Sequence, residues 1–166
     1  MMRFVLIGAV ALGMGGAVSA QDADGLYYDF APTSLCIARS ETSAERSECI
    51  GRATEACINA TGYATPVLSG CAFRELENWD AHLNAVYQAQ RARSREFDMG
   101  GGANAPSLAV GLRDMQRAWI EYRDATCSYE AAQWGGGTGA GPAFAGCLTR
   151  LTAEQALYLE FEGMGG

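Results

Sequence analysis

Residues 108–129 carry the clearest hydrophobic pattern in the chain. Their apolar positions advance in alternating steps of four and three, which keeps one stripe of a helix facing a partner over about six turns. A strand would alternate by twos, and this stretch does not. Pro106 lies near the first helical position, and Gly135–Gly137 does not favour continuation of the helix. The stripe consists of Leu108, Leu112, Met115, Trp119, Tyr122, Thr126 and Tyr129. We expect a long helix here, at the centre of a bundle.

Weaker patterns predict shorter helices before this stretch. Residues 34–40 can form one or two helical turns. Thr42 or Ser43 can then cap a second helix, because a side-chain oxygen at that position accepts a hydrogen bond from a free backbone amide. This helix runs to about Asn59, and Pro66 breaks the chain after it.

A third, long helix is expected to begin with Ser69 as its cap and to run to about Phe97. Its apolar stripe consists of Phe73, Leu76, Leu83, Val86 and Tyr87, with Trp79 beside it. Three arginines, Arg91, Arg93 and Arg95, lie in its last turns, where cations complement a helix C-terminus. An anion-binding patch is the alternative interpretation. After a glycine-rich loop, residues 135–141, Pro142 opens a last helix.

The first 20 residues predict a signal peptide. Arg3 supplies the positive start, an apolar run follows, and small residues allow a cut after Ala20. The run is too short and too glycine-rich to favour a membrane span, and without a cysteine after the cut we expect no lipid anchor. The rest of the chain divides into an N-terminal cysteine-bearing helical segment, residues 21–70, and a second helical part, residues 71–162. We therefore expect a periplasmic or secreted protein.

The charge balance is acidic. The 166-residue chain has a formal net charge of −7, and loss of Arg3 with the signal peptide would make it −8. An acidic exported domain is a poor candidate for binding nucleic acid or anionic membrane surfaces. The charge suits a basic partner, although acidity also simply keeps proteins soluble.

All six cysteines lie after the expected cut, and an even count in an exported chain predicts three disulfides. With one histidine and no Cys-x-x-Cys spacing, we expect no metal site. Cysteines that flank the same turn lie at nearly matching levels of two antiparallel helices. We therefore favour pairing in sequence order, although the sequence alone does not select among the other pairings. The favoured pairs are Cys36–Cys49, Cys57–Cys71 and Cys127–Cys147. The predicted fold class is all-α, a small disulfide-stapled antiparallel helical bundle.

One group of residues resembles a known family. It consists of Cys71, Glu75, Leu83, Asn84, Tyr87, Leu112, Gln116, Trp119, Tyr122, Arg123, Asp124, Cys127 and Cys147. Together with the glycine-rich loop, this pattern resembles the bacterial LprI-type lysozyme inhibitor family over about residues 71–151. The resemblance implies an inhibitor of lysozyme-type enzymes. Two departures are the additional helical segment at residues 22–68 and the expected absence of the lipid anchor of the family's namesake.

The motif residues have ordinary structural interpretations. Trp119 and Tyr122 are expected to pack in the core. Arg123 can pair with Glu75 or Glu77 of the preceding helix, and Asp124 with Arg117 or Arg91, which would fix the helix register. A polar cluster presented to a partner is the alternative. We expect Gln116 and Asn84 to bond to backbone or neighbouring-helix groups.

We expect neither an enzyme nor a cofactor. Glu121 and Asp124 share a helical face, as paired carboxylates do in glycoside cleavage, but such pairs are usually a solvated surface. His82 lacks a nucleophile motif beside it. The cysteines are committed to bridges, so no thiol nucleophile remains.

Two functions remain. The first is an inhibitor that binds a basic lysozyme-type enzyme, with the loop of Gly135, Gly136, Gly137 and Thr138 entering the enzyme's cleft, or with the acidic face of Glu121 and Asp124 in contact with it. The alternative is an envelope structural or scaffold protein with no inhibitory activity. Neither the true target nor the oligomeric state follows from the sequence.

Overall fold

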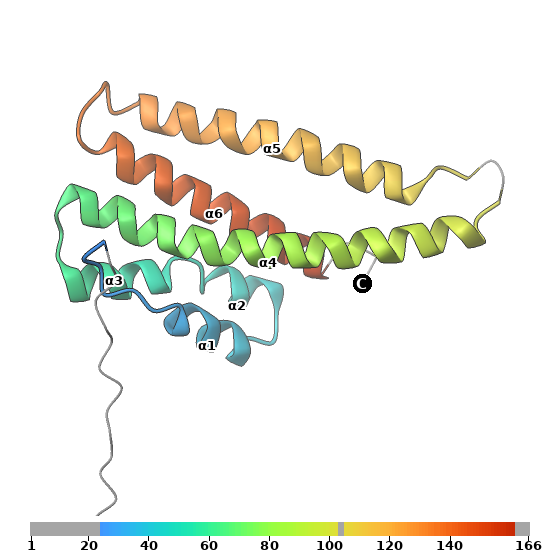
Figure 1. Ribbon diagram of the computed structural model, residues 1–166, viewed down its shortest axis with the longest axis horizontal. Helices are drawn as coiled ribbons and strands as arrows, with labels where there is room; N and C mark the ends of the chain where they lie inside the picture. Colours follow the sequence, from blue (N-terminus) through green and yellow to red (C-terminus); the bar gives the residue numbers. More distant parts are fainter. Residues whose placement is uncertain (1–23, 103–104, 162–166) are drawn as a thin grey trace, which may run out of the picture.

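The computed structural model describes residues 24–102 and 105–161, and these residues form six α-helices (Figure 1). The helices are α1 (Ala31–Arg39), α2 (Ser43–Ser47), α3 (Arg52–Thr61), α4 (Thr65–Gly100), α5 (Leu108–Ala132) and α6 (Ala140–Phe161). The described part contains no strand, so the all-α prediction is confirmed. The expected signal peptide, residues 1–20, and its cut after Ala20 lie outside the described residues.

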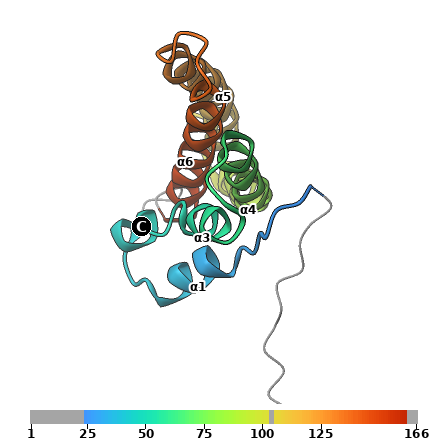
Figure 2. The ribbon, with the colours of Figure 1, turned by 90° about the vertical axis from the view of Figure 1, so that its left-hand side faces the viewer.

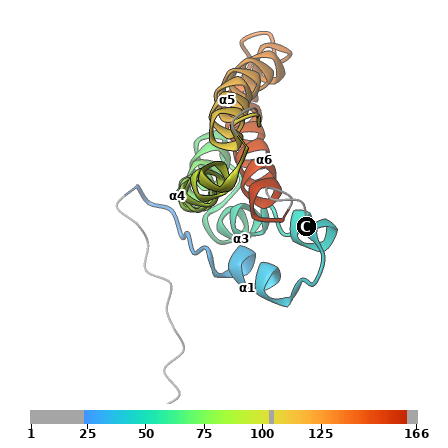
Figure 3. The same ribbon diagram turned by 90° about the vertical axis from the view of Figure 1, so that its right-hand side faces the viewer.

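The helices form three layers. End-on views show α5 above the pair α4 and α6, with α1, α2 and α3 beneath (Figures 2 and 3). Helices α4 and α6 run in the same direction, and α5 runs against them (Figure 1). Helix α6 packs against α4, α5 and α2. Half of its 22 residues are buried, as expected for a helix covered on several sides. The central helix is therefore α6, and the expectation that residues 108–129 occupy the centre is wrong.

The core is built around Trp79 of α4, which is 1% exposed. Its ring contacts the ring of Phe30 edge-on, with 6.0 Å between the centroids. Leu83, Leu112 and Leu159 bury their side chains in the same cluster. The apolar stripe expected on α4 differs slightly from its buried face. Trp79, expected beside the stripe, lies at the middle of the buried face, and Phe73, expected in the stripe, is exposed.

The buried face of α5 also differs from the expected stripe. Leu112, Gln116 and Cys127 are buried, whereas Tyr122 is 59% exposed. Trp119 is half-buried and packs against the Trp79 cluster, so its role in packing agrees with the prediction and that of Tyr122 does not. Leu108 and Tyr129 of the expected stripe are exposed as well. The face of α5 that contacts the other helices includes polar residues. A stripe drawn from apolar positions alone therefore missed part of this face.

Several helix boundaries depart from the sequence reading: α1 begins at Ala31 and α6 at Ala140, each a few residues before the expected start. The second expected helix is split into α2 and α3 at Gly51, whose φ of 90° lies in the left-handed region that favours glycine. Thr42 caps α2 as expected, in a capping box with Glu45. Helix α4 begins at Thr65 with a proline in its first turn, where the missing amide costs nothing. Ser69 is therefore not a cap.

Three disulfides staple these helices. They join Cys36 to Cys49, Cys57 to Cys71 and Cys127 to Cys147, with Cα–Cα distances of 5.6, 5.8 and 5.4 Å. These are the pairs favoured from the spacing. The first links α1 to the end of the α2 region, the second links α3 to α4, and the third links α5 to α6.

The carboxylate of Glu75 fixes the lower layer to α4. Its side chain is fully buried and accepts five hydrogen bonds. The donors are the hydroxyls of Thr33 and Thr54, the amides of Gly51 and Thr54 and the indole of Trp79, at 2.7 to 3.2 Å. A buried carboxylate is costly unless hydrogen bonds replace its hydration. Glu75 thus holds α1, the α2–α3 turn and α3 in one arrangement on α4.

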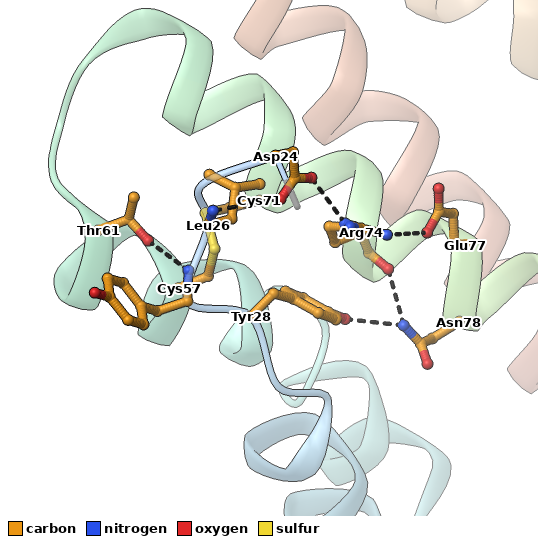
Figure 4. Close-up of polar contacts among 10 residues, drawn as sticks. Asp24, Leu26, Tyr28, Cys57, Thr61, Cys71, Arg74, Glu77 and Asn78 are labelled. Atoms are coloured by element: carbon orange, nitrogen blue, oxygen red, sulfur yellow. Dashed lines mark hydrogen bonds and ion pairs between the residues drawn. A yellow bond between two sulfur atoms is a disulfide. The ribbon is translucent and has the colours of Figure 1, made fainter. Parts of the chain in front are cut away.

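The segment before α1 is tied to the same helices (Figure 4). Arg74 of α4 pairs with Asp24 at 3.1 Å, and the amide of Asn78 donates to the hydroxyl of Tyr28 at 3.1 Å. Burial, and then the nearby charge of Glu75, raise the pKa of Tyr28. Leu26 is buried against Gly70, where a Cβ atom would lie 2.9 Å from a Leu26 methyl carbon. The segment is therefore part of the folded domain.

A preorganised loop as the candidate interaction site

The connection between α5 and α6, residues 133–139, is a folded turn. The amide of Gly135 donates to the carbonyl of Ala132 at 3.0 Å, and the amide of Gly137 donates to that of Trp134 at 2.8 Å. Gly135 and Gly136 have φ values of 56° and 83°, which side chains with a Cβ atom rarely adopt. The glycines therefore set one particular turn, where the sequence suggested a flexible loop.

Trp134 lies near the start of this turn, directly after the C-cap of α5. Its side chain is 56% exposed, and one side of its ring rests on the backbone of Gly139. A Cβ atom at Gly139 would lie 2.1 Å from a ring carbon of Trp134. The ring is therefore seated on the loop itself, with the rest of its surface open to solvent. An aromatic held in this way loses little conformational freedom when it binds a partner.

The base of the loop is closed by covalent and ionic links between α5 and α6. Cys127–Cys147 joins the two helices, and Arg150 of α6 pairs with Glu130 of α5 at 2.8 Å. Arg150 also lies 3.7 Å from Glu154 on its own helix. These links hold the two ends of the loop at a fixed separation.

The expected partner-binding residues fall into two places. Gly135, Gly136, Gly137 and Thr138 lie together in the loop, and all four are exposed. Glu121 and Asp124 are exposed on α5, but they precede Gln133 by twelve and nine residues, roughly 18 and 14 Å along the helix axis. The structure therefore does not bring the acidic face and the loop together as one site.

The ion pairs expected for the motif are not formed. Arg123 pairs with its neighbour Asp124 at 2.8 Å, and its guanidinium lies 5.0 Å from the centre of the Trp119 ring. It also approaches the hydroxyl of Thr152 on α6. Glu75 is occupied by its own five donors, which leaves it no role as a partner. Arg123 thus lies as a planar cation on the ring of Trp119 in its own helix and reaches α6 only at Thr152.

The other motif residues have mainly structural contacts. Gln116 accepts a hydrogen bond from Gln155 of α6 at 3.0 Å, which agrees with the expected link to a neighbouring helix. Asn84 instead donates to Asp80 on its own exposed face at 3.1 Å. Leu83 is buried, and Tyr87 packs half-buried against the same core.

Three further features concern metal binding, the single histidine and membrane spans. Among the described residues, no group of three or more His, Cys, Asp or Glu side chains is arranged to hold a metal ion. His82 lies 3.2 Å from Glu160 of α6 and edge-on to the ring of Trp79. Within residues 24–102 and 105–161, no helix is both long and apolar enough to cross a membrane.

Sequence reasoning missed two residues. Trp134 was assigned no role, although a large aromatic directly before three glycines was a usable signal, because a side chain in such a loop has no core to enter. Glu75 was considered only as a residue of the family pattern and as a partner of Arg123. Its place four residues before Trp79 on the same helix face was the available hint that it lies in the core.

Fold and site together define a disulfide-stapled helical domain with a preorganised aromatic loop, an architecture suited to binding another protein. The lysozyme inhibitor LprI family model matches residues 57–159, from α3 to α6. The chain belongs to this family.

The chain is also similar to two proteins whose functions are not described. An uncharacterized 17.7 kDa protein from the puhA 5′ region of Rhodobacter capsulatus is 32% identical over 138 residues, which cover 80% of this chain and 85% of that protein. An uncharacterized protein of Rhizobium meliloti (strain 1021) is 33% identical over 97 residues, covering 56% of this chain and 69% of that protein. No solved structure matches the chain.

Proposed function

We propose that the protein is exported, loses its signal peptide after Ala20 and inhibits a basic lysozyme-type enzyme by inserting the Trp134 loop into the enzyme's cleft. The observation that carries the proposal is the exposed indole of Trp134, seated on Gly139 in a turn whose base is closed by Cys127–Cys147. The family match supplies the class of target, and three disulfides suit an oxidising compartment outside the cytoplasm.

The shape of the loop favours inhibition over weak surface contact. Exposed aromatics that are already held in place are enriched among residues that dominate binding energy. A glycine-rich turn adds little bulk around the ring, so the indole can enter a groove that a broader surface could not. The cleft of a glycan-cleaving enzyme is such a groove.

The charge of the chain supports the same target. The formal net charge of the 166 residues is −7, opposite in sign to that of a basic enzyme. A basic enzyme would therefore be steered toward the protein. Association should slow markedly between low and physiological salt, where the screening length falls to about 8 Å.

The test is an inhibition assay with the oxidised chain that begins at Gln21. Basic lysozymes of several classes hydrolyse cell-wall glycan with and without the protein, and the inhibition constant is measured. Trp134→Ser should weaken inhibition about thirtyfold, the effect of removing a central aromatic contact. Tyr158→Ser is the matched control, since Tyr158 is a similarly exposed aromatic near the opposite end of α6.

Two results would redirect the proposal. If Trp134→Ser inhibits like the parent while Glu121→Gln/Asp124→Asn does not, the contact lies on the acidic face of α5. If every lysozyme stays fully active with the protein in large excess, inhibition is excluded, and an envelope scaffold role takes its place.

A further inference from the structure

The end of the α4–α5 hairpin projects beyond the rest of the bundle. The amide of Gln90 on α4 donates to the carbonyl of Leu159 near the end of α6, and α4 continues for ten residues past Gln90 to Gly100. Figure 1 shows this extension together with the start of α5, at the opposite end of α5 from the Trp134 loop. We call residues 91–102 and 105–111 the arm, because Leu112 and Gln116 already pack in the bundle.

The arm has the opposite charge to the rest of the molecule. It contains three arginines, Arg91, Arg93 and Arg95, against two acids, Glu96 and Asp98, a net charge of +1. The other described residues contain eight arginines against fifteen acids, a net charge of −7. The acidic total therefore conceals a basic end.

Part of this positive charge is free of internal partners. Asp98 is occupied in capping α5. Arg93 and Arg95 are exposed, with no ion-pair partner in the described part of the chain. Because α4 runs to Gly100, Arg93 and Arg95 lie outside its last turn, where a helix dipole would account for them.

The arm also ends in exposed apolar side chains. Phe97 is 62% and Met99 81% exposed, and Leu108 and Val110 at the start of α5 are exposed as well. Arg93 and Arg95 lie two to six residues behind the pair Phe97 and Met99, roughly 3 to 9 Å along the helix. The apolar side chains thus lie at the end of the arm, and the cations lie a few ångströms behind them. This order matches a lipid interface, where acyl chains lie beneath anionic headgroups.

We propose that the arm docks end-on to a lipid surface that carries anionic headgroups. Phe97 and Met99 enter the acyl boundary while Arg93 and Arg95 contact the headgroup phosphates. A hydrated polyanion would bind the arginines but leave Phe97 and Met99 in water. The exposed apolar residues therefore favour a lipid surface over nucleic acid or an acidic polysaccharide. The proposal does not depend on lysozyme binding, because it concerns the other end of α5.

The test is cosedimentation of the oxidised chain that begins at Gln21 with vesicles of phosphatidylglycerol and phosphatidylcholine, or of phosphatidylcholine alone. Binding is expected to the anionic vesicles only. Each arginine near an anionic surface contributes about fivefold to affinity, so Arg93→Gln/Arg95→Gln should weaken binding about thirtyfold. The control Arg39→Gln/Arg52→Gln removes the same charge from α1 and α3 and should change binding less than about twofold.

Substitutions of the apolar residues separate lipid from other partners. Phe97→Ser/Met99→Ser should weaken vesicle binding at least about tenfold, whereas Leu35→Ser, at an exposed leucine of α1, should not. Arg93→Lys/Arg95→Lys keeps the charge and should keep binding. Circular dichroism melting confirms that each variant is folded.

Three outcomes would overturn the proposal. The first is equal binding to neutral and anionic vesicles. The second is full binding by Phe97→Ser/Met99→Ser with loss only on arginine substitution, which would indicate a site for soluble polyanions. The third is concentration-dependent dimerisation in sedimentation velocity that Phe97→Ser/Met99→Ser abolishes, which would make the tip a self-association surface.

Discussion

Among single residues, Glu75 has the densest set of contacts, and its substitution should be costly. Glu75→Gln keeps the shape of the side chain but turns one acceptor oxygen into a donor that faces the donors of Thr33, Gly51 and Thr54. We expect a loss of roughly 2–4 kcal/mol in the free energy of unfolding. Urea denaturation measures it. Glu55→Gln, at an exposed acid of α3, is the control and should stay within about 0.5 kcal/mol. Equal midpoints for the two variants would contradict the assignment of Glu75.

Gly139 offers a way to move Trp134 without altering it. The Cβ atom of Gly139→Ala would occupy the seat of the indole ring, so the ring must swing away. Inhibition should weaken at least about tenfold because the preorganised position is lost. Melting temperature should change little, since an exposed loop adds little to the core. The control is Gly146→Ala in α6, where a new Cβ meets nothing within 4 Å. This substitution should raise the free energy of unfolding by about 0.5–1 kcal/mol. Unchanged inhibition by Gly139→Ala would show that the seat is irrelevant.

At this scale the sequence shows residue types but not their surroundings. The cysteine pairs followed from spacing because a disulfide constrains two positions on neighbouring helices. The seat of Trp134 required the φ values of two glycines and the close approach of a third, which no periodicity encodes. The burial of Glu75 depended on donors up to 42 residues away in the chain.

Among the helices, α5 depends on a cap from its neighbour. Asp98 of α4 accepts hydrogen bonds from the hydroxyl of Ser107 and the amides of Leu108 and Ala109, at 2.7 to 3.1 Å. The Ser107 bond, followed by the amide bonds, holds the pKa of Asp98 below its ordinary value. The group therefore contributes stability above its unfolded pKa of about 3.9, and this contribution is lost as pH falls through the lower folded pKa.

This cap makes the start of α5 acid-sensitive. Amide hydrogen exchange at Leu108 and Ala109 should be slow near neutral pH, after correction for the intrinsic rate, and their protection should fall below about pH 4. Asp98→Ala should remove the protection at neutral pH and flatten its pH dependence. Protection at Gly62, whose amide bonds to Ile58 of α3, is the internal control. Retained protection in Asp98→Ala would mean that Ser107 alone caps the helix.

The order and type of the helices followed from the sequence better than their faces. Long apolar periods located α4, α5 and α6, because 3.6-residue spacing is a local property. The face of α5 was misplaced because Gln116 and Arg123 face α6, and polar groups with partners are accepted in a contact. The central position of α6 depended on three neighbours at once, which its own residues do not specify.

Across the whole molecule, the disulfides should have separable effects on stability and inhibition. Cys127→Ser/Cys147→Ser removes a link across 20 residues of chain and should cost about 3 kcal/mol in the free energy of unfolding. It should also weaken inhibition, because the base of the Trp134 loop can spread. Cys36→Ser/Cys49→Ser should cost a similar free energy but leave inhibition intact. Thermal melting and the lysozyme assay on both variants check this, and equal inhibition by the two would contradict it.

The total charge was the least informative of the global properties. It argued against an anionic surface as a partner, yet its sum combined a basic arm with an acidic body. The basic and acidic parts are separated because α4 extends beyond the end of α6. How far one helix extends past another depends on where each one packs. The family resemblance, by contrast, rested on local spacing and was confirmed by the match over residues 57–159.

The disulfide connectivity has a consequence for how the chain matures. Each bridge joins a cysteine to the next one in the sequence, across 13, 14 and 20 residues, and no two bridges interlock. In the proposed export the first pair can close before the third pair has emerged, since short loops close fastest. An oxidant that joins cysteines in their order of arrival would produce the native set directly. We therefore expect maturation to need an oxidase but no isomerase to reshuffle mispaired bridges.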